Sequence, residues 1–128
     1  MADEVDDNKR ELVVAHNNAF REALAMRLNL EEDLEVACQA GSITDTRDVH
    51  LNGIDVALVD PFLPDGDGLE LIREVSVANP NAVALVFSHK LDPALYQRAS
   101  GAGAVEVLAT NAGIEEVVDA VRRSAAAE

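Results

Sequence analysis

Asp60 is the residue of this sequence that is best placed to do chemistry. It follows an apolar run, residues 54–59, which is rich in β-branched side chains and typical of a strand buried on both faces of a parallel sheet. In open α/β sheets, ligands bind beyond the carboxyl ends of the strands, so we expect the carboxylate of Asp60 at the functional edge. The plainer alternative is that Asp60 only caps the turn that begins at Pro61.

Other polar residues follow expected strands and should lie at the same edge. Ser88 ends the apolar run 82–87, His89 comes directly after it, and His16 follows the first apolar run of the chain. The imidazole of His16 could pair with Asp60, titrate near neutral pH or bind a transition metal. We favour an ordinary loop histidine, because no second histidine or cysteine is placed to complete a metal site, although His89 keeps the alternative open. No nucleophile has a base beside it, so we expect neither an enzyme nor a cofactor.

Alternating strands and helices are expected to position these residues. Apolar runs predict five strands, at residues 11–15, 34–38, 54–59, 82–87 and 105–108. Helical spacing and capping signals predict five helices, which begin near residues 18, 43, 69, 93 and 114. The second of them, residues 43–50, is short and mostly polar. The alternation indicates an α/β fold, with a parallel sheet, right-handed crossovers and helices on both faces.

The length of 128 residues fits a single domain. Residues 1–10 are acidic and aperiodic, and we expect them to form a disordered lead-in. Residues 11–124 should form the domain, and residues 125–128 should fray. Hydrophobic residues make up 48% of the chain and aromatic residues only 3%, so the core must be aliphatic, which suits α/β layers.

Charge and cysteine usage exclude several classes of protein. Ten basic and 24 acidic residues give a formal net charge of −14, which repels nucleic-acid phosphates and anionic lipids. We therefore expect no direct binding to nucleic acid or membrane. The single cysteine, Cys38, cannot form an internal disulfide, and no apolar run is long enough for a membrane span or a signal peptide. These features predict a cytoplasmic protein.

The loop after Asp60 carries a motif. Residues 64–70 have the sequence PDGDGLE, which resembles the phosphoacceptor region of response-regulator receiver domains, where an aspartate after an apolar strand is followed by Pro-x-x-Asp-Gly and Leu-Glu. The resemblance covers residues 12–123, with every element in the family's order. It implies a CheY-like, flavodoxin-like doubly wound sheet of order 2-1-3-4-5. It also implies that Asp60 is the phosphoacceptor and that Ser88 and Thr110 contact the phosphoryl group.

Other positions depart from the family's pattern. Receivers usually place two acidic residues after the first strand to hold Mg²⁺ and a lysine after the fifth strand, whereas this chain has Ala15, His16 and Thr110 there. Mg²⁺ prefers octahedral coordination by oxygen atoms. Only Asp60 and the carbonyl group of Phe62 remain to bind it. We therefore expect Mg²⁺ binding to be weak or absent, and no other metal site.

These departures predict an atypical receiver that works as an interaction module with little or no phosphorylation. A conventional phosphoacceptor at Asp60 is one alternative. Another is a pseudo-receiver that senses a small molecule. Its pocket would be formed by Asp60, Ser88 and Thr110 together with Ala15, His16, Phe62 and His89.

The loop chemistry most resembles receivers of the NarL/FixJ type, and this resemblance implies partners. A sensor histidine kinase would phosphorylate the chain, and a homodimer would form through the last helices. A C-terminal DNA-binding domain, outside this chain, would follow residues 122–124, where a linker would begin. The chain is then expected to be the N-terminal part of a transcriptional regulator.

Overall fold

Five runs of apolar residues form a parallel sheet, as the sequence predicts. In the computed structural model, which describes residues 9–109 and 113–126, the strands are β1 (Lys9–Val14), β2 (Leu34–Ala40), β3 (Val56–Val59), β6 (Val83–Ser88) and β7 (Ala104–Ala109). They lie in the order β2-β1-β3-β6-β7, and each neighbouring pair is parallel. This is the predicted order 2-1-3-4-5, because β6 and β7 are the fourth and fifth strands of the sheet.

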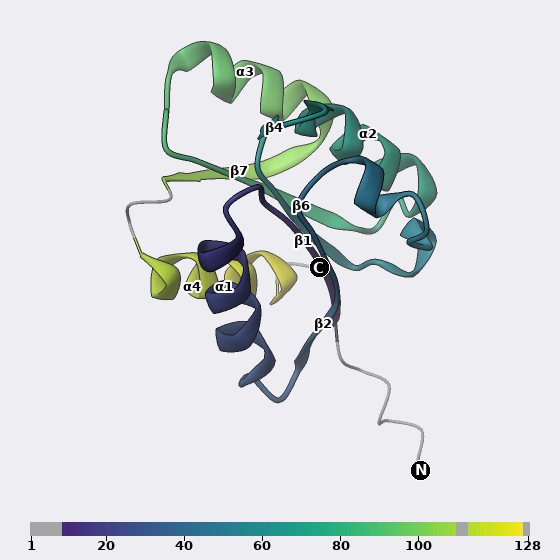
Figure 1. Ribbon diagram of the computed structural model, residues 1–128, viewed down its shortest axis with the longest axis vertical. Helices are drawn as coiled ribbons and strands as arrows, with labels where there is room; N and C mark the ends of the chain where they lie inside the picture. The colour runs from purple at the N-terminus through teal and green to yellow at the C-terminus, as the bar shows by residue number, and fades with distance from the viewer. Residues whose placement is uncertain (1–8, 110–112, 127–128) are drawn as a thin grey trace.

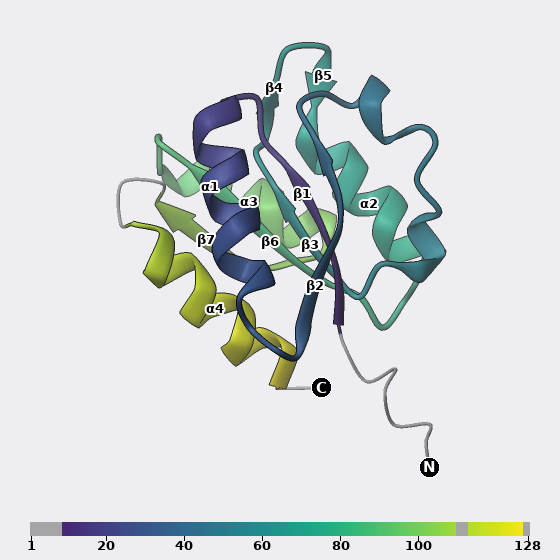
Figure 2. The same cartoon turned by 60° about the horizontal axis from the view of Figure 1, so that its bottom comes forward.

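Helices cover both faces of this sheet. The described residues contain four α-helices: α1 (Asn18–Asn29), α2 (Gly68–Ala78), α3 (Pro93–Ala102) and α4 (Ile114–Ala126). Figures 1 and 2 show α1 and α4 on one face and α2 and α3 on the other. Successive side chains of a strand point to opposite faces, so Val13 of β1 packs with α1 and α4, and Val14 packs with α2 and α3. Both faces of β1 and β3 are therefore buried.

The prediction of a helix over residues 43–50 is wrong, and the described residues contain four α-helices instead of the expected five. The segment instead forms 3-10 turns at Thr44–Thr46 and Leu51–Gly53. Few of its side chains are apolar, so packing cannot stabilise a longer helix. The carboxylate of Asp65 also accepts hydrogen bonds from the backbone N–H groups of Ile43 and Thr44, at 2.9 Å each, which ties the first turn to a distant loop.

Several element boundaries differ from those predicted by one or two residues. β1 begins at Lys9, two residues early, because the N–H of Lys9 donates to the carbonyl of Asp33 at 3.0 Å and continues the pairing with β2. α4 continues to Ala126, so residues 125 and 126 belong to the helix and not to the predicted tail. Residues 1–8 of the predicted lead-in and residues 127–128 of the tail lie outside the described residues.

The loop after β3 folds into a small antiparallel hairpin of β4 (Phe62–Leu63) and β5 (Gly66–Asp67). This hairpin leads directly into α2. Gly68 begins that helix, and a Cβ atom there would overlap the carbonyl oxygen of Asp60. The glycine therefore allows the start of α2 to lie against the end of β3.

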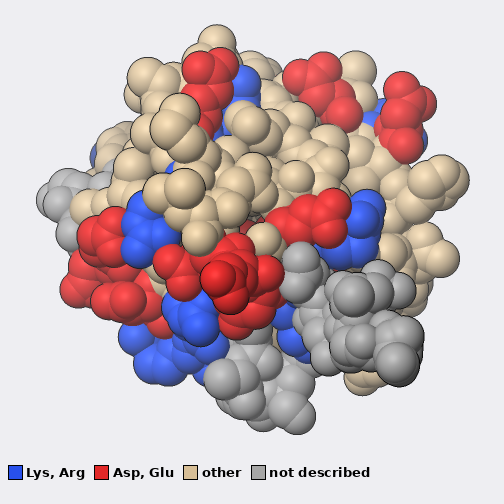
Figure 3. All heavy atoms as spheres, turned by 90° about the horizontal axis from the view of Figure 1, so that it is seen from below, with Lys and Arg blue, Asp and Glu red and all other residues tan. Residues whose placement is uncertain are grey.

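Ion pairs connect α1, the turn that follows it and α4. Arg27 binds Glu31 and Glu115 at 2.7 Å each, and Arg122 binds Glu31 at 2.8 Å and Asp33 at 2.7 Å. In the view of Figure 3, acidic and basic side chains lie together on the face seen from below. A single exposed ion pair contributes about 0 to 1 kcal/mol, but a shared network restricts how α4 can lie beside α1.

Candidate functional site

Asp60 lies at the carboxyl edge of the sheet, directly after β3. Its backbone N–H donates to the carbonyl of Val14 at 2.9 Å, which holds it beside the end of β1. Its Oδ1 accepts a hydrogen bond from the N–H of Phe62 at 2.8 Å. Its Oδ2 accepts no hydrogen bond from the described residues, so one carboxylate oxygen remains available as a nucleophile or a ligand.

Burial raises the pKa of Asp60, and three neighbours oppose this increase. The N–H of Phe62 donates to the carboxylate, and the charges that His89 and His16 can carry favour its ionised form. Both imidazoles therefore lie close enough to Asp60 to interact with its charge. The structure brings together His16, Asp60 and His89, as the ends of β1, β3 and β6 require.

A cation of α1 reaches back to the turn after β1, and sequence reasoning missed this contact. Ala15 is buried, and its carbonyl oxygen accepts a hydrogen bond from Nη1 of Arg21 at 2.7 Å. His16, the next residue, is exposed. A guanidinium group thus lies at the strand end where the receiver pattern has two carboxylates. No sequence signal revealed this contact, because Arg21 sits in an ordinary helical position of α1.

Ser88, the predicted hydroxyl contact for the phosphoryl group, is the last residue of β6. Ser88 is 1% exposed, and its Oγ accepts a hydrogen bond from the N–H of Lys90 at 3.1 Å, while its hydroxyl proton has no acceptor among the described residues. His89 and Lys90 are exposed. Thr110, the other predicted phosphoryl contact, lies outside the described residues.

The two aspartates of the motif, Asp65 and Asp67, hold the loop in place. Hydrogen bonds from the hydroxyl group of Thr44 and from the N–H groups of Ile43 and Thr44 lower the pKa of Asp65 to about 2. Asp67 caps α2 and also binds Arg98 of α3 at 2.8 Å. Sequence reasoning missed these contacts, because the partners lie 22 and 31 residues away along the chain.

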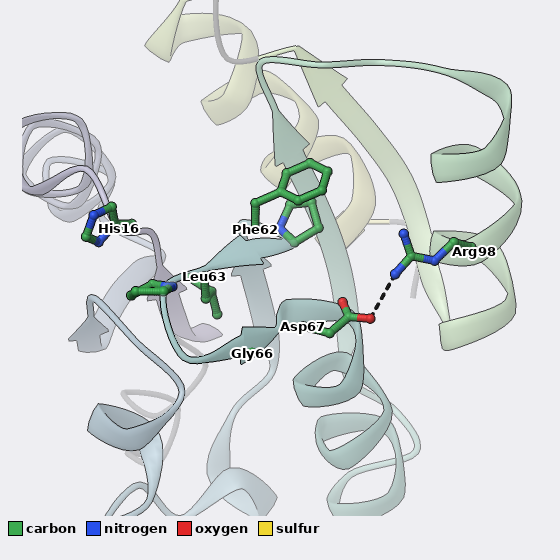
Figure 4. A pocket seen from close by; sticks show the side chains of 8 residues that line it. His16, Phe62, Leu63, Gly66, Asp67 and Arg98 are labelled. Carbon is green, nitrogen blue, oxygen red and sulfur yellow. Dashed lines mark hydrogen bonds and ion pairs between the residues drawn. The ribbon is translucent and has the colours of Figure 1, made fainter.

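A cavity of about 450 Å³ lies between the β4–β5 hairpin, the turn after β1 and α3 (Figure 4). Its lining includes His16, Pro61, Phe62, Pro64, Asp67 and Arg98. His16 and Phe62 belong to the predicted pocket, whereas Asp60, Ser88, Ala15 and His89 are not among the residues that line this cavity. Within the described ranges, no three His, Cys, Asp or Glu side chains gather closely enough to hold a metal ion.

A family model described as the response regulator receiver domain matches residues 12–122. The chain belongs to this family. The structure of the signal receiver domain of the response regulator NarL from Mycobacterium tuberculosis superimposes with a TM-score of 0.81 and 26% identity, over 95% of this chain and 99% of that one. A CheY-like receiver domain from Methanospirillum hungatei JF-1 gives a TM-score of 0.82 over 92% of this chain and 94% of that one, and its 20% identity supports the fold alone.

A longer relative places the receiver domain in context. The transcriptional regulatory protein UhpA of Salmonella typhimurium is 33% identical over 103 residues, which cover 79% of this chain and 50% of the relative. This chain thus spans about half the length of that relative. Receiver domains are signalling modules of two-component systems and not enzymes. No helix in the described part of this chain has the length and apolar character needed to cross a bilayer.

Proposed function

We propose that this chain is an atypical receiver that acts as a protein-interaction module, with Asp60 phosphorylated slowly or not at all. The observation that carries the proposal lies at the end of β1. Ala15 and His16 stand where the receiver pattern has two acidic residues, and Arg21 occupies the carbonyl oxygen of Ala15. Phosphoryl transfer depends mainly on positioning and on cations that neutralise the phosphoryl oxygens, and Mg²⁺ is normally one of them.

The residues present fit Mg²⁺ poorly. Around Asp60, the oxygen donors left for an ion are the free Oδ2 and the carbonyl of Phe62, whereas Mg²⁺ prefers an octahedral set that includes one or two carboxylates. The sequence also has Thr110 where receivers carry a lysine. If the loss of the ion and the lysine raises the barrier by roughly 4 kcal/mol, transfer slows about a thousandfold.

Incubation with acetyl phosphate and Mg²⁺ tests the proposal. We expect intact-mass spectrometry to show only a small phosphorylated fraction, and addition of EDTA to change that fraction little. Asp60→Asn provides the baseline, because it lacks the acceptor oxygen. Rapid stoichiometric labelling that Asp60→Asn abolishes would refute the proposal.

That outcome would instead support a conventional phosphoacceptor, the second candidate function. Two observations favour it. Within the described ranges, Oδ2 of Asp60 accepts no hydrogen bond, and the Ser88 hydroxyl, at the end of the adjacent strand, donates none. In that case Asp60 would attack the phosphorus atom of acetyl phosphate, form an acyl phosphate and release acetate.

The wider context is also part of the proposal. UhpA is named a transcriptional regulatory protein, and the NarL receiver gives a high structural similarity, so we propose a NarL/FixJ-type receiver at the N-terminus of a cytoplasmic transcriptional regulator. A sensor histidine kinase is the proposed upstream partner. The net charge of −14 argues that any contact with DNA comes from another domain.

We further propose that the chain forms a homodimer through α3, β7 and α4, and this interface can be tested by charge insertion. Val105 of β7 is 61% exposed and Tyr96 of α3 is 47% exposed, so apolar surface is available there. Val105→Lys is expected to shift the dimer to monomer in sedimentation equilibrium. Val77→Lys is the matched control, because Val77 is 82% exposed on α2 and should leave the dimer intact. A wild-type chain that is monomeric at about 100 μM would contradict the interface.

A further inference from the structure

We propose that the cavity beside the β4–β5 hairpin binds a small organic anion with an apolar ring or chain. Pro61, Phe62, Leu63 and Pro64 contribute an apolar wall, and Phe62 leaves 49% of its surface exposed. Covering an aromatic side chain stabilises a complex, so this ring favours an apolar ligand part. The volume of about 450 Å³ lies within the range of small-molecule pockets, roughly 300 to 1,000 Å³.

Arg98 supplies hydrogen-bond donors at one end of the cavity. Figure 4 shows its side chain reaching from α3 to Asp67. That hydrogen bond, of 2.8 Å, uses Nη2 and is the single one that the guanidinium makes within the described ranges. A guanidinium carries five N–H donors in a planar fork, so donors on Nε and Nη1 remain for a carboxylate or phosphate group. His16, on the other side of the hairpin, offers a further N–H group.

The hydrogen-bond donors along the wall favour an anion over a cation. Asp67 is the one carboxylate among the lining residues, and Arg98 neutralises it. The chain as a whole carries a charge of −14, but salt screens distant charges beyond about 8 Å, so the free donors of Arg98 act most strongly at the cavity. The overall charge still reduces affinity, so the apolar contact with Phe62 must contribute much of the binding.

A titration of the ¹⁵N-labelled chain with sodium benzoate, followed by NMR, tests this site. We expect chemical-shift changes concentrated at the hairpin and at Arg98, with a dissociation constant of about 1 to 10 mM. Arg98→Gln and Phe62→Ala should each weaken binding at least about fivefold, because they remove the charged and the apolar contact. Arg73→Gln of α2 is the matched control: Arg73 and Arg98 have equally exposed side chains, 52%, and Arg73 also pairs with a carboxylate, Glu70.

Three comparison outcomes would each overturn the proposal. Benzylamine that binds as tightly as benzoate would exclude selection for an anion. Inorganic phosphate that binds as tightly would exclude the apolar contact. An absence of shifts at about 20 mM benzoate would exclude the site itself.

Arg98→Gln could also release Asp67 and disturb α2. Phe62→Ala then still tests whether the cavity binds benzoate, because this half-exposed ring can be truncated without opening the core. Anion binding in this cavity does not depend on phosphorylation of Asp60, so this proposal and the proposed function can be refuted independently.

Discussion

Replacing Glu11 with leucine is expected to raise the free energy of unfolding by about 3 kcal/mol at pH 7, and by more at pH 9. Glu11 lies in β1 between Val36 of β2 and Val56 of β3, and it is fully buried. Neither of its carboxylate oxygens has a hydrogen-bond partner among the described residues. Burial, and to a smaller extent the charge of Asp33, raises the pKa of Glu11 from 4.5 to about 8.

The direction of the pH dependence follows from this raised pKa. Between about pH 4.5 and pH 8, Glu11 is ionised in the unfolded chain but keeps its proton in the folded chain. The folded state then binds more protons, so its stability falls as the pH rises through this window. One pKa unit corresponds to 1.36 kcal/mol, so the full window is worth on the order of 5 kcal/mol. A leucine does not titrate and also removes an unpaired polar group from the core.

Urea unfolding at pH 5, 7 and 9 measures the effect. We expect the difference between Glu11→Leu and wild type to grow across this range. Glu11→Gln should follow the same pH dependence as Glu11→Leu, because neither side chain titrates. It should be less stable than Glu11→Leu, because its buried amide also lacks a partner. Glu35→Gln is the control, since Glu35 lies on β2 with half of its side chain exposed. Parallel stability curves for wild type and Glu11→Leu would contradict the raised pKa.

The sheet could be predicted from sequence because its strands are local signals. β3 and β6 are continuous apolar runs, and a strand buried on both faces requires that composition. The segment after β2 could not be predicted in this way. Its backbone donors are taken by Asp65, a residue that follows a different strand, so a distant contact decides whether a helix forms.

The candidate site was predictable to the extent that it depends on strand ends. Asp60 and His16 follow strands, Ser88 is the last residue of β6, and parallel pairing brings these ends to one edge. The contacts of Arg21 and Arg98 were not predictable, because long side chains reach partners that only the tertiary structure places. The burial of Glu11 could have been predicted from the sequence, because a glutamate in a strand covered on both faces is buried whichever face its side chain points to.

Placing two carboxylates after β1 is expected to increase the rate at which acetyl phosphate phosphorylates Asp60 by about 100-fold or more. The double variant Ala15→Asp/His16→Asp adds ligands for Mg²⁺ beside Oδ2 of Asp60, and a gain of about 2.7 kcal/mol in transition-state stabilisation corresponds to that factor. Of the two changes, His16→Asp should contribute more. His16 is exposed and interacts with the charge of Asp60, whereas Ala15 is buried beside Arg21, which would pair with a new carboxylate there.

Isothermal titration with Mg²⁺ and intact-mass labelling with acetyl phosphate measure the two effects separately. His16→Asn is the control for loss of the imidazole, because it adds no negative charge and should leave both measurements near those of wild type. Adding Asp60→Asn to the double variant should abolish labelling and weaken Mg²⁺ binding, since Asp60 supplies the acceptor oxygen. A double variant that binds Mg²⁺ but remains unlabelled would assign the missing catalysis to the strand-five position, where Thr110 replaces the usual lysine. A double variant that does not bind Mg²⁺ would show that Arg21 excludes the ion whatever residues follow β1, and Arg21→Gln in that background would then be expected to restore binding.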